Sequence, residues 1–201
     1  MDLLTARFYA IDVETTGLDQ AKDEIISFAC VPIVNLKIIV RENYYTLIKP
    51  ARYNYKAMKY HGISRTDLQA APTFEDVSDH LLKMLDGILV GHTVEFDFNF
   101  LKKSFKASGL KFKKDLIDIA MVEKWLTQRC NAEGRGLTLD DMIEAYGLKR
   151  HYRHNAAADA FFAAQIFQMQ MLAMMKFGID SAEKVIKAAR SCRYANSDTV
   201  C

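Results

Sequence analysis

The sequence lacks the cysteine patterns of a disulfide framework or a zinc site. Its 201 residues include four scattered cysteines, and no two of them form a CxxC pair: Cys30, Cys130, Cys192 and Cys201. The gaps between them fit no zinc motif. We therefore expect free or buried thiols in a reducing compartment.

Long apolar segments are also missing. No uninterrupted apolar run reaches the length of about 20 residues that a membrane-spanning helix needs. The first residues, MDLLTARF, lack the basic start and the apolar core of a signal peptide. The sequence therefore predicts a soluble, cytoplasmic protein without a membrane partner.

The chain carries little net charge, formally +2, with an isoelectric point near 8.3. A protein that holds a long nucleic-acid duplex by charge alone is usually more basic. A protein that grips a short strand end with the help of metal ions is not excluded by this balance.

No linker, internal repeat or low-complexity block divides the chain, which is 50% hydrophobic and 26% charged. This composition is typical of a globular protein, and the length favours one domain. We expect that domain over residues 1–190, followed by a polar tail over residues 191–201. The segment NAEGRG, residues 131–136, predicts an internal loop.

The apolar pattern changes along the chain from strands to alternating strands and helices. Residues 6–12, 24–34 and 37–50 predict an antiparallel meander, with NLK as a short hairpin between the last two strands. Helical spacing follows at residues 73–85, where Thr73 and Asp76 are placed as a capping box. The remaining expected elements are a strand at 87–92, a helix at 96–105, a strand running into a helix at 115–122, and helices at 138–148, 155–177 and 181–190. This order predicts an α/β fold with a mixed sheet.

Two acids stand at the end of the first predicted strand. Asp12 and Glu14 are two residues apart, so their side chains project from the same face of a strand. Converging carboxylates repel each other unless a proton or a cation lies between them. Magnesium and manganese ions suit such oxygen ligands. The alternative is a capped turn with two solvated acids.

Three further residues with suitable chemistry lie at predicted helix starts. Asp97 follows an apolar strand, where an acid can simply favour the helix dipole. Asp159 interrupts an alanine-rich apolar run. His154 precedes it by five residues, so both can serve one site only if His154 lies in the loop before the helix. A histidine there suits a general base, and a cap or a surface imidazole is the alternative.

The segments DVETTG, GHTVEFDFNFL and HNAAAD occur in this order and spacing over roughly residues 6–170. Together they resemble the three motifs of the DEDD superfamily of 3′–5′ exonucleases, in the subgroup that carries a histidine (DEDDh). Members of this family include the proofreading (epsilon) subunit of bacterial DNA polymerase III and ribonuclease T. The segment HGIS, residues 61–64, matches another family segment. Thr93 and Asn155 depart from common family residues, but neither change removes a metal ligand or the base.

The resemblance implies a ribonuclease H-like fold, with a five-stranded mixed sheet and helices on both faces. It implies two Mg²⁺ ions, replaceable by Mn²⁺, held by Asp12, Glu14, Asp97 and Asp159. His154 would be the general base, which completes the five expected catalytic residues. The expected substrate-binding residues are Thr15, Thr16, Gly17, Leu18, His61 and Phe96, although Phe96 also suits a plain core position.

The implied activity is release of nucleoside 5′-monophosphates from the 3′ ends of single-stranded or frayed DNA, with proofreading for a DNA polymerase as one role. An RNA-trimming exonuclease is the first alternative, because discrimination of the sugar depends on a few contacts with the 2′-hydroxyl group. A catalytically silent nucleic-acid-binding module is the second. The expected partners are single-stranded 3′ ends, DNA rather than RNA, and a polymerase.

Overall fold

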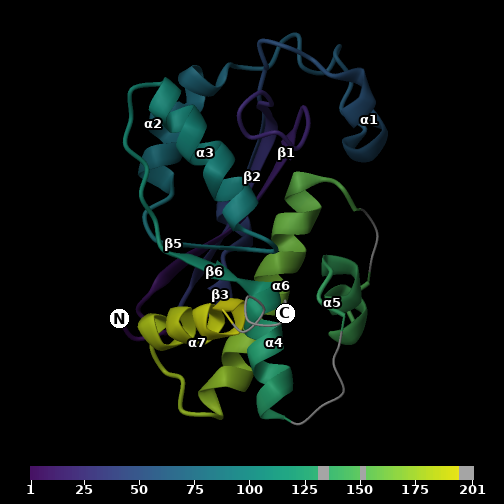
Figure 1. Cartoon of the computed structure of the whole chain (residues 1–201). Coiled ribbons are helices and arrows are strands. Elements are labelled where there is room, and N and C mark those ends of the chain that lie inside the picture. The colour runs from purple at the N-terminus through teal and green to yellow at the C-terminus, as the bar shows by residue number, and fades with distance from the viewer. Residues whose placement is uncertain (131–135, 150–152, 195–201) are drawn as a thin grey trace.

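A mixed β-sheet separates two hydrophobic cores in the computed structural model, which describes residues 1–130, 136–149 and 153–194 (Figure 1). The strands are β1 (Arg7–Thr15), β2 (Ile25–Val34), β3 (Lys37–Ile38), β4 (Tyr44–Leu47), β5 (Ile88–Gly91) and β6 (Leu116–Asp118). Their order is β3-β2-β1-β5-β6, and β4 also pairs with β2. Strand β1 is antiparallel to β2 and parallel to β5. Strands β3 and β4 both pair with the same edge of β2, one after the other along its length. The six strands therefore form a sheet that is five strands wide, as expected.

The third predicted strand, residues 37–50, is interrupted. A 3₁₀ turn, η1 (Val40–Glu42), separates β3 from β4. The carbonyl of Pro32 accepts a hydrogen bond from the Ile39 amide, but proline has no N–H to donate in return. The ladder is therefore incomplete at this point, and the chain leaves the sheet before rejoining it. The hairpin itself is confirmed, with both Asn35 and Leu36 at positive φ as a type I′ turn requires.

Helices cover both faces of the sheet, as Figure 1 shows. They are α1 (Tyr55–His61), α2 (Phe74–Met84), α3 (Glu95–Ala107), α4 (Ile119–Arg129), α5 (Leu139–Ala145), α6 (Ala156–Met175) and α7 (Ala182–Tyr194). Helices α2 and α3 bury residues in one core, and α4, α5, α6 and α7 bury residues in the other. The capping box of Thr73 and Asp76 is confirmed at the start of α2.

Two differences from the sequence expectations concern helices. Helix α1 was not predicted, and Ala57 is its one buried residue. Its exposure explains the miss, because a helix with almost no apolar face leaves no periodic pattern. Helix α7 continues to Tyr194, beyond the predicted end at residue 190, and Cys192 is buried. Most of the predicted loop, residues 131–135, and the last residues of the predicted tail, 195–201, lie outside the described residues.

Strand β1 sends alternate side chains to the two cores. Phe8 and Ala10 belong to the core on the α6 side, whereas Tyr9 and Ile11 belong to the core on the α3 side. This two-residue period places the next side chains of the first set, those of Asp12 and Glu14, on the α6 side. The strand therefore changes from apolar to acidic along one face, at its carboxyl end.

Within the described part of the chain, no helix combines the length and the apolar character that crossing a membrane would require.

Candidate active site

The predicted carboxylates of β1 and α6 come together. Asp12, Glu14 and Asp159 each offer an oxygen atom, and these atoms lie within 4.8 Å of one another. Asp159 lies in the first turn of α6, which packs along β1 and β2. Glu14 and Asp159 are 145 positions apart in the sequence. The packing of the long helix α6 on the sheet brings them together.

Asp97 reaches the same end of β1 from a different direction. It lies in the first turn of α3, just after the parallel strand β5, and it is buried. Its carboxylate accepts a hydrogen bond from the backbone amide of Val13, with 2.9 Å between Oδ1 and N. Asp97 thus holds the strand segment between Asp12 and Glu14, although it is not one of the three acids within 4.8 Å.

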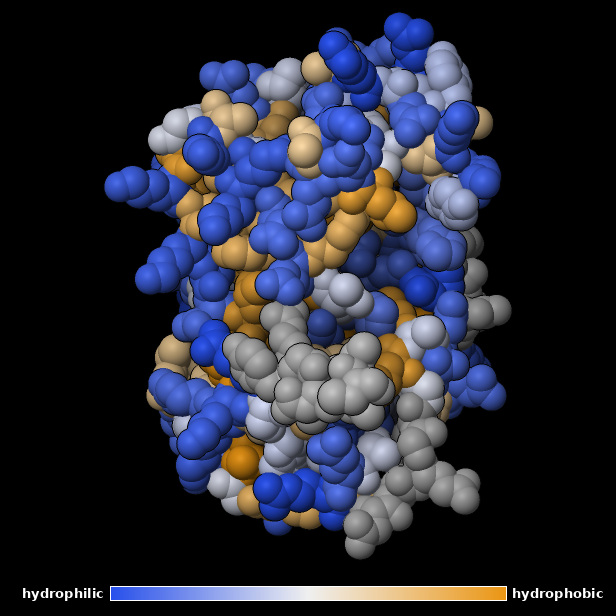
Figure 2. Space-filling model, in the orientation of Figure 1, coloured by the Kyte–Doolittle hydropathy of each residue, from blue (hydrophilic) through white to orange (hydrophobic). Residues whose placement is uncertain are grey.

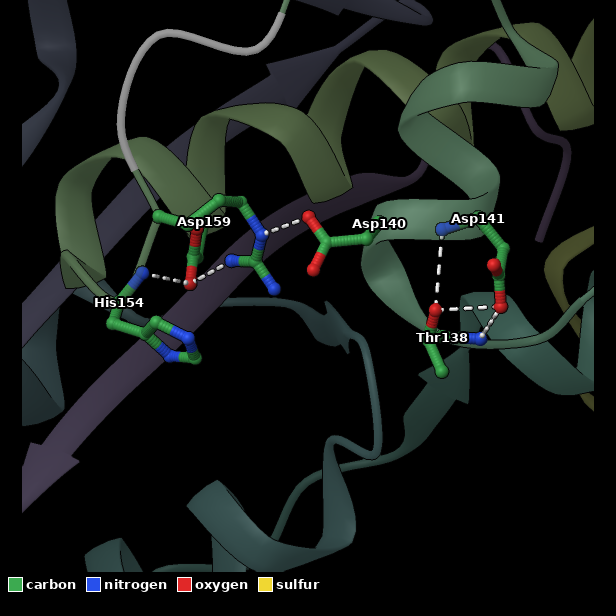
Figure 3. Close-up of polar contacts among 6 residues, drawn as sticks. Thr138, Asp140, Asp141, His154 and Asp159 are labelled. Carbon is green, nitrogen blue, oxygen red and sulfur yellow. Dashed lines mark hydrogen bonds and ion pairs between the residues drawn. The ribbon is translucent and has the colours of Figure 1, made fainter. Parts of the chain in front are cut away.

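His154 lies in the loop before α6, as the sequence reasoning required. Asn155 is the N-cap of the helix, and its side chain accepts a hydrogen bond from the Ala158 amide. His154 has a positive φ of 57°, and its backbone N–H donates to Asp159 Oδ2 at 3.2 Å. The chain therefore turns back toward Asp159, while the exposed imidazole ring extends away from α6 (Figure 3).

Sequence reasoning missed Arg153, the residue before His154. Its guanidinium forms one ion pair with Asp159 and another with Asp140 of α5, where Nε lies 2.9 Å from Oδ1 (Figure 3). The Arg153 side chain is only 16% exposed. The signal available in the sequence was a cation directly beside the HNAAAD segment, but nothing in the spacing indicated which acid it would meet.

Burial and neighbouring carboxylates raise the pKa values of Asp12, Glu14 and Asp97. Burial and the neighbouring carboxylates of Asp97, Asp159 and Glu14 raise the pKa of Asp12 well above its usual range. Burial, with Asp159 next, raises the pKa of Glu14 to about 7. Burial raises the pKa of Asp97 to about 8, against the lowering effect of the Val13 hydrogen bond. These side chains are therefore costly to ionise together without a further cation.

These residues fit divalent metal ions. All the donors are carboxylate oxygens, which Mg²⁺ and Mn²⁺ prefer. Asp159 Oδ1 is buried without a hydrogen-bond partner, although buried polar atoms are rarely left unpaired. Arg153 supplies one positive charge to the cluster, fewer than its four carboxylates carry when ionised. The site has both the donor atoms and the need for positive charge.

The segment after Glu14 is a tightly bonded turn. The Thr16 amide donates to Glu24 O at 2.9 Å, and the Thr16 hydroxyl donates to Asp23 at 3.0 Å. A Cβ atom on Gly17 would lie 2.4 Å from the Asp23 carboxylate and would displace it. Leu18 at the tip is 83% exposed. Of these expected substrate-binding residues, Thr15 and Thr16 are buried and Leu18 is open to solvent.

The other two expected substrate-binding residues differ in their surroundings. His61 ends α1, and its Nδ1 accepts a hydrogen bond from the Ile63 amide at 3.0 Å. Its Nε2 is buried without a partner, and burial lowers the pKa of the ring. Phe96 is half-buried and packs on Phe100, with ring centroids 4.9 Å apart. Phe96 is thus in part a core residue, in line with the alternative left open from the sequence.

Most of the chain matches a known protein family and several known proteins. The family model RNase_T, described as Exonuclease, matches residues 9–167. The PolC-type DNA polymerase III of Thermotoga maritima is 34% identical over 94% of this chain, which corresponds to 14% of that protein. The DNA polymerase III subunit epsilon of Aquifex aeolicus is 31% identical over 83% of this chain and 81% of its own length.

The fold agrees with these matches. Exonuclease I of E. coli, solved with a dT13 oligonucleotide, superposes with a TM-score of 0.75 at 17% identity, over 86% of this chain and 42% of that one. This similarity confirms the ribonuclease H-like fold. The chain spans only about one seventh of the PolC-type relatives that it matches, so it corresponds to one part of those proteins.

Proposed function

This chain belongs to the RNase_T exonuclease family, and on that basis we propose that it is a metal-dependent 3′–5′ exonuclease. Its substrate is the 3′ end of single-stranded or frayed DNA, and its products are nucleoside 5′-monophosphates. The observation that carries the proposal is the meeting of Asp12, Glu14 and Asp159, with Asp97 and His154 at the same end of the sheet.

Asp12, Glu14, Asp97 and Asp159 would hold two Mg²⁺ ions, with Mn²⁺ as a substitute. Such ions supply positive charge that stabilises the attacking and leaving oxygens of a phosphoryl displacement. The chain contributes the preorganised carboxylates. The Val13–Asp97 hydrogen bond ties α3 to β1, and the packing of α6 on β1 fixes Asp159 opposite Glu14.

His154 acts as the general base. The attacking water gives a proton to its imidazole as the water oxygen bonds to phosphorus, and the bond from phosphorus to the 3′-oxygen of the preceding nucleotide breaks. A histidine suits this step because its pKa ordinarily lies near neutrality. The exposed ring on a loop before α6 is free to approach such a water.

The terminal nucleotide is gripped by the turn at Thr15, Thr16, Gly17 and Leu18, together with His61 and Phe96. The exposed Leu18 suits a wedge against the last base, and the unpaired His61 Nε2 suits a hydrogen bond to the nucleotide. DNA is the preferred substrate, since Exonuclease I was solved with a DNA oligonucleotide and two of the sequence relatives are a PolC-type DNA polymerase III and a DNA polymerase III subunit.

A role in proofreading beside a DNA polymerase follows from the same relatives. The Aquifex aeolicus relative is a polymerase subunit of similar length, and the PolC-type relatives carry the matching segment within a polymerase chain. We place the protein in the cytoplasm, where its thiols stay reduced; the three cysteines that the structure describes are free. The proposed exonuclease domain spans residues 1–190 and continues through the end of α7 at Tyr194.

The test is cleavage of 5′-labelled DNA and RNA oligonucleotides, single-stranded and duplex, with Mg²⁺, Mn²⁺ or EDTA. A metal-dependent ladder that shortens from the 3′ end supports the proposal, and the faster sugar decides between DNA and RNA. Absence of cleavage with either metal by folded protein would refute it and favour a silent binding module.

A further inference from the structure

Residues 49–65 form a basic segment that contains none of the expected metal ligands. They contain five cations and no acid, although the whole chain has a net charge of only +2; the cations are Lys49, Arg52, Lys56, Lys59 and Arg65. The segment includes α1 and its two flanks, and Figure 2 shows the corner of the molecule over α1 as mainly hydrophilic. Neither the family match nor the catalytic chemistry accounts for this concentration of charge.

A groove of about 640 Å³ lies along this segment. Its lining includes Lys49, Arg52, Tyr53, Tyr55, Arg65 and Gln69, and no described acid contributes to it. We infer that this groove binds the single strand upstream of the terminal nucleotide, with phosphates on its cations and a base on Tyr55. The inference rests on the proposed exonuclease activity and extends it from the cleaved end to the strand behind that end.

The cations of the groove are available to a ligand. Lys49, Arg52 and Arg65 are exposed, and none of them forms an ion pair with another residue that the structure describes. The acids that contact the segment are already bonded. Glu24 accepts hydrogen bonds from the Ala51 and Arg52 amides, and Asp67 accepts from Ser64. Phosphate groups would therefore meet cations that form no ion pair with a described carboxylate.

The groove also presents an exposed aromatic ring on which a base can stack. Tyr55 is 64% exposed, so its ring is open to a ligand. Tyr53 packs edge to face against it, with ring centroids 4.9 Å apart, and the Tyr53 hydroxyl donates to Ile63 O at 2.7 Å. The Tyr53 ring is thus held in place and orients the Tyr55 ring. Cations beside an exposed ring are the arrangement that single strands of any sequence require.

A hydrogen bond connects the groove to the active site. The Asn54 side chain caps α1 and also donates to Thr16 O at 2.8 Å. Thr16 follows Glu14 by two residues, so this hydrogen bond fixes the start of α1 next to the acidic end of β1. His61, expected at the terminal nucleotide, ends the same helix. A strand held at His61 and extending along α1 therefore reaches the groove.

The experiment compares strands of increasing length. Wild-type protein, Tyr55→Ala, Tyr55→Phe and the double variant Arg52→Ala/Arg65→Ala are assayed on single-stranded DNA of 2 to 12 nucleotides. We expect the wild-type KM to fall as the strand lengthens into the groove. In Tyr55→Ala the KM for the longest strand should rise about 5- to 100-fold toward the dinucleotide value, whereas Tyr55→Phe retains the ring and the length dependence.

Binding is measured separately from cleavage. Fluorescence anisotropy with a 12-nucleotide strand in EDTA reports affinity when no hydrolysis occurs. In the double variant the slope of log affinity against log salt should be smaller by about 1.4, because two phosphate contacts with the single strand are lost. Lys187→Ala, an exposed cation on α7, is the matched control and should bind like the wild type.

The two possible failures are distinguishable. A wild-type protein that cleaves with no dependence on strand length, and whose groove variants bind the strand as tightly as the wild type, overturns the inference and leaves the exonuclease proposal intact. A wild-type protein that cleaves nothing, but whose strand binding falls in the groove variants, refutes the exonuclease proposal and supports the groove.

Discussion

Arg153 and Asp159 form an ion pair in which the guanidinium approaches the carboxylate cluster from the side of α5. Asp140 holds the other edge of the same guanidinium. Arg153 therefore contributes the positive charge that the acids need, on the carboxylate that also offers an unpaired oxygen atom. A cation at this position lowers the cost of folding the acids together, but it also occupies Asp159, which metal ions would share.

Replacing Arg153 should separate these two effects. We expect Arg153→Ala to bind Mg²⁺ and Mn²⁺ about tenfold more tightly, because a competing charged contact of Asp159 is lost. The same variant should unfold more easily in EDTA, since a buried carboxylate loses its partner. Calorimetric titration measures the first effect and thermal unfolding the second.

Arg190→Ala is the matched control for Arg153→Ala. Its ion pair with Asp115 is more than 60% exposed on both sides, so neither metal affinity nor stability should change appreciably. Equal or weaker metal binding by Arg153→Ala would show that the arginine does not compete with the ions.

Asp12→Asn should abolish cleavage and yet stabilise the metal-free protein. The substitution removes a buried charge that Asp97, Asp159 and Glu14 all disfavour. Differential scanning calorimetry in EDTA at pH 8 should show a higher Tm than the wild type, and the oligonucleotide assay should show no products. Full activity in this variant would remove Asp12 from the site; Asp115→Asn, at an exposed position, serves as the control.

His154→Ala should lower the cleavage rate ~10²- to 10⁴-fold if the imidazole is the general base. His154→Gly should lose as much rate, because it also lacks the ring. It should nevertheless be more stable than His154→Ala by about 1 kcal/mol, since glycine adopts the positive φ of 57° without strain. Recovery of the rate in His154→Gly would assign the effect to the backbone instead of the side chain.

The stability of the metal-free protein should depend on pH through the acidic cluster. The folded pKa values of Glu14, about 7, and of Asp97, about 8, lie above their ordinary values of 4.5 and 3.8. The folded protein thus holds these protons more tightly than the unfolded chain. Their contribution to the free energy of unfolding is therefore complete at pH values below the ordinary pKa values. It is lost as the pH rises through about 7 to 8.

Thermal unfolding in EDTA should therefore show a falling Tm between pH 5 and pH 9. The Asp97→Asn variant should show a shallower fall, because one of the titrating groups is gone. Added Mg²⁺ should restore the Tm most strongly at the high end of this range, where the acids are ionised. A wild-type Tm that does not change across this range would contradict the raised pKa values.

The sequence by itself indicated the general fold and predicted a set of catalytic residues. The order of the three motifs carries the resemblance to the exonuclease family. The shared strand face of Asp12 and Glu14 and the need for His154 to precede the helix follow from local geometry. These features depend on residues close together in the chain, which is why they could be recognised without coordinates. The capping box at Thr73 and the hairpin at residues 35–36 are local in the same sense.

Only the tertiary structure decided which partners these residues meet across the chain. The Arg153 guanidinium joins α5 to α6, and the Val13 amide binds Asp97 from α3. The edge of the sheet is interrupted between β3 and β4, opposite Pro32 of β2. Helix α1 escaped prediction because it buries almost nothing, although its first residue, Tyr55, lines the basic groove. Periodic patterns report burial along one element, whereas ion pairs, grooves and shared hydrogen bonds depend on how separate elements pack together.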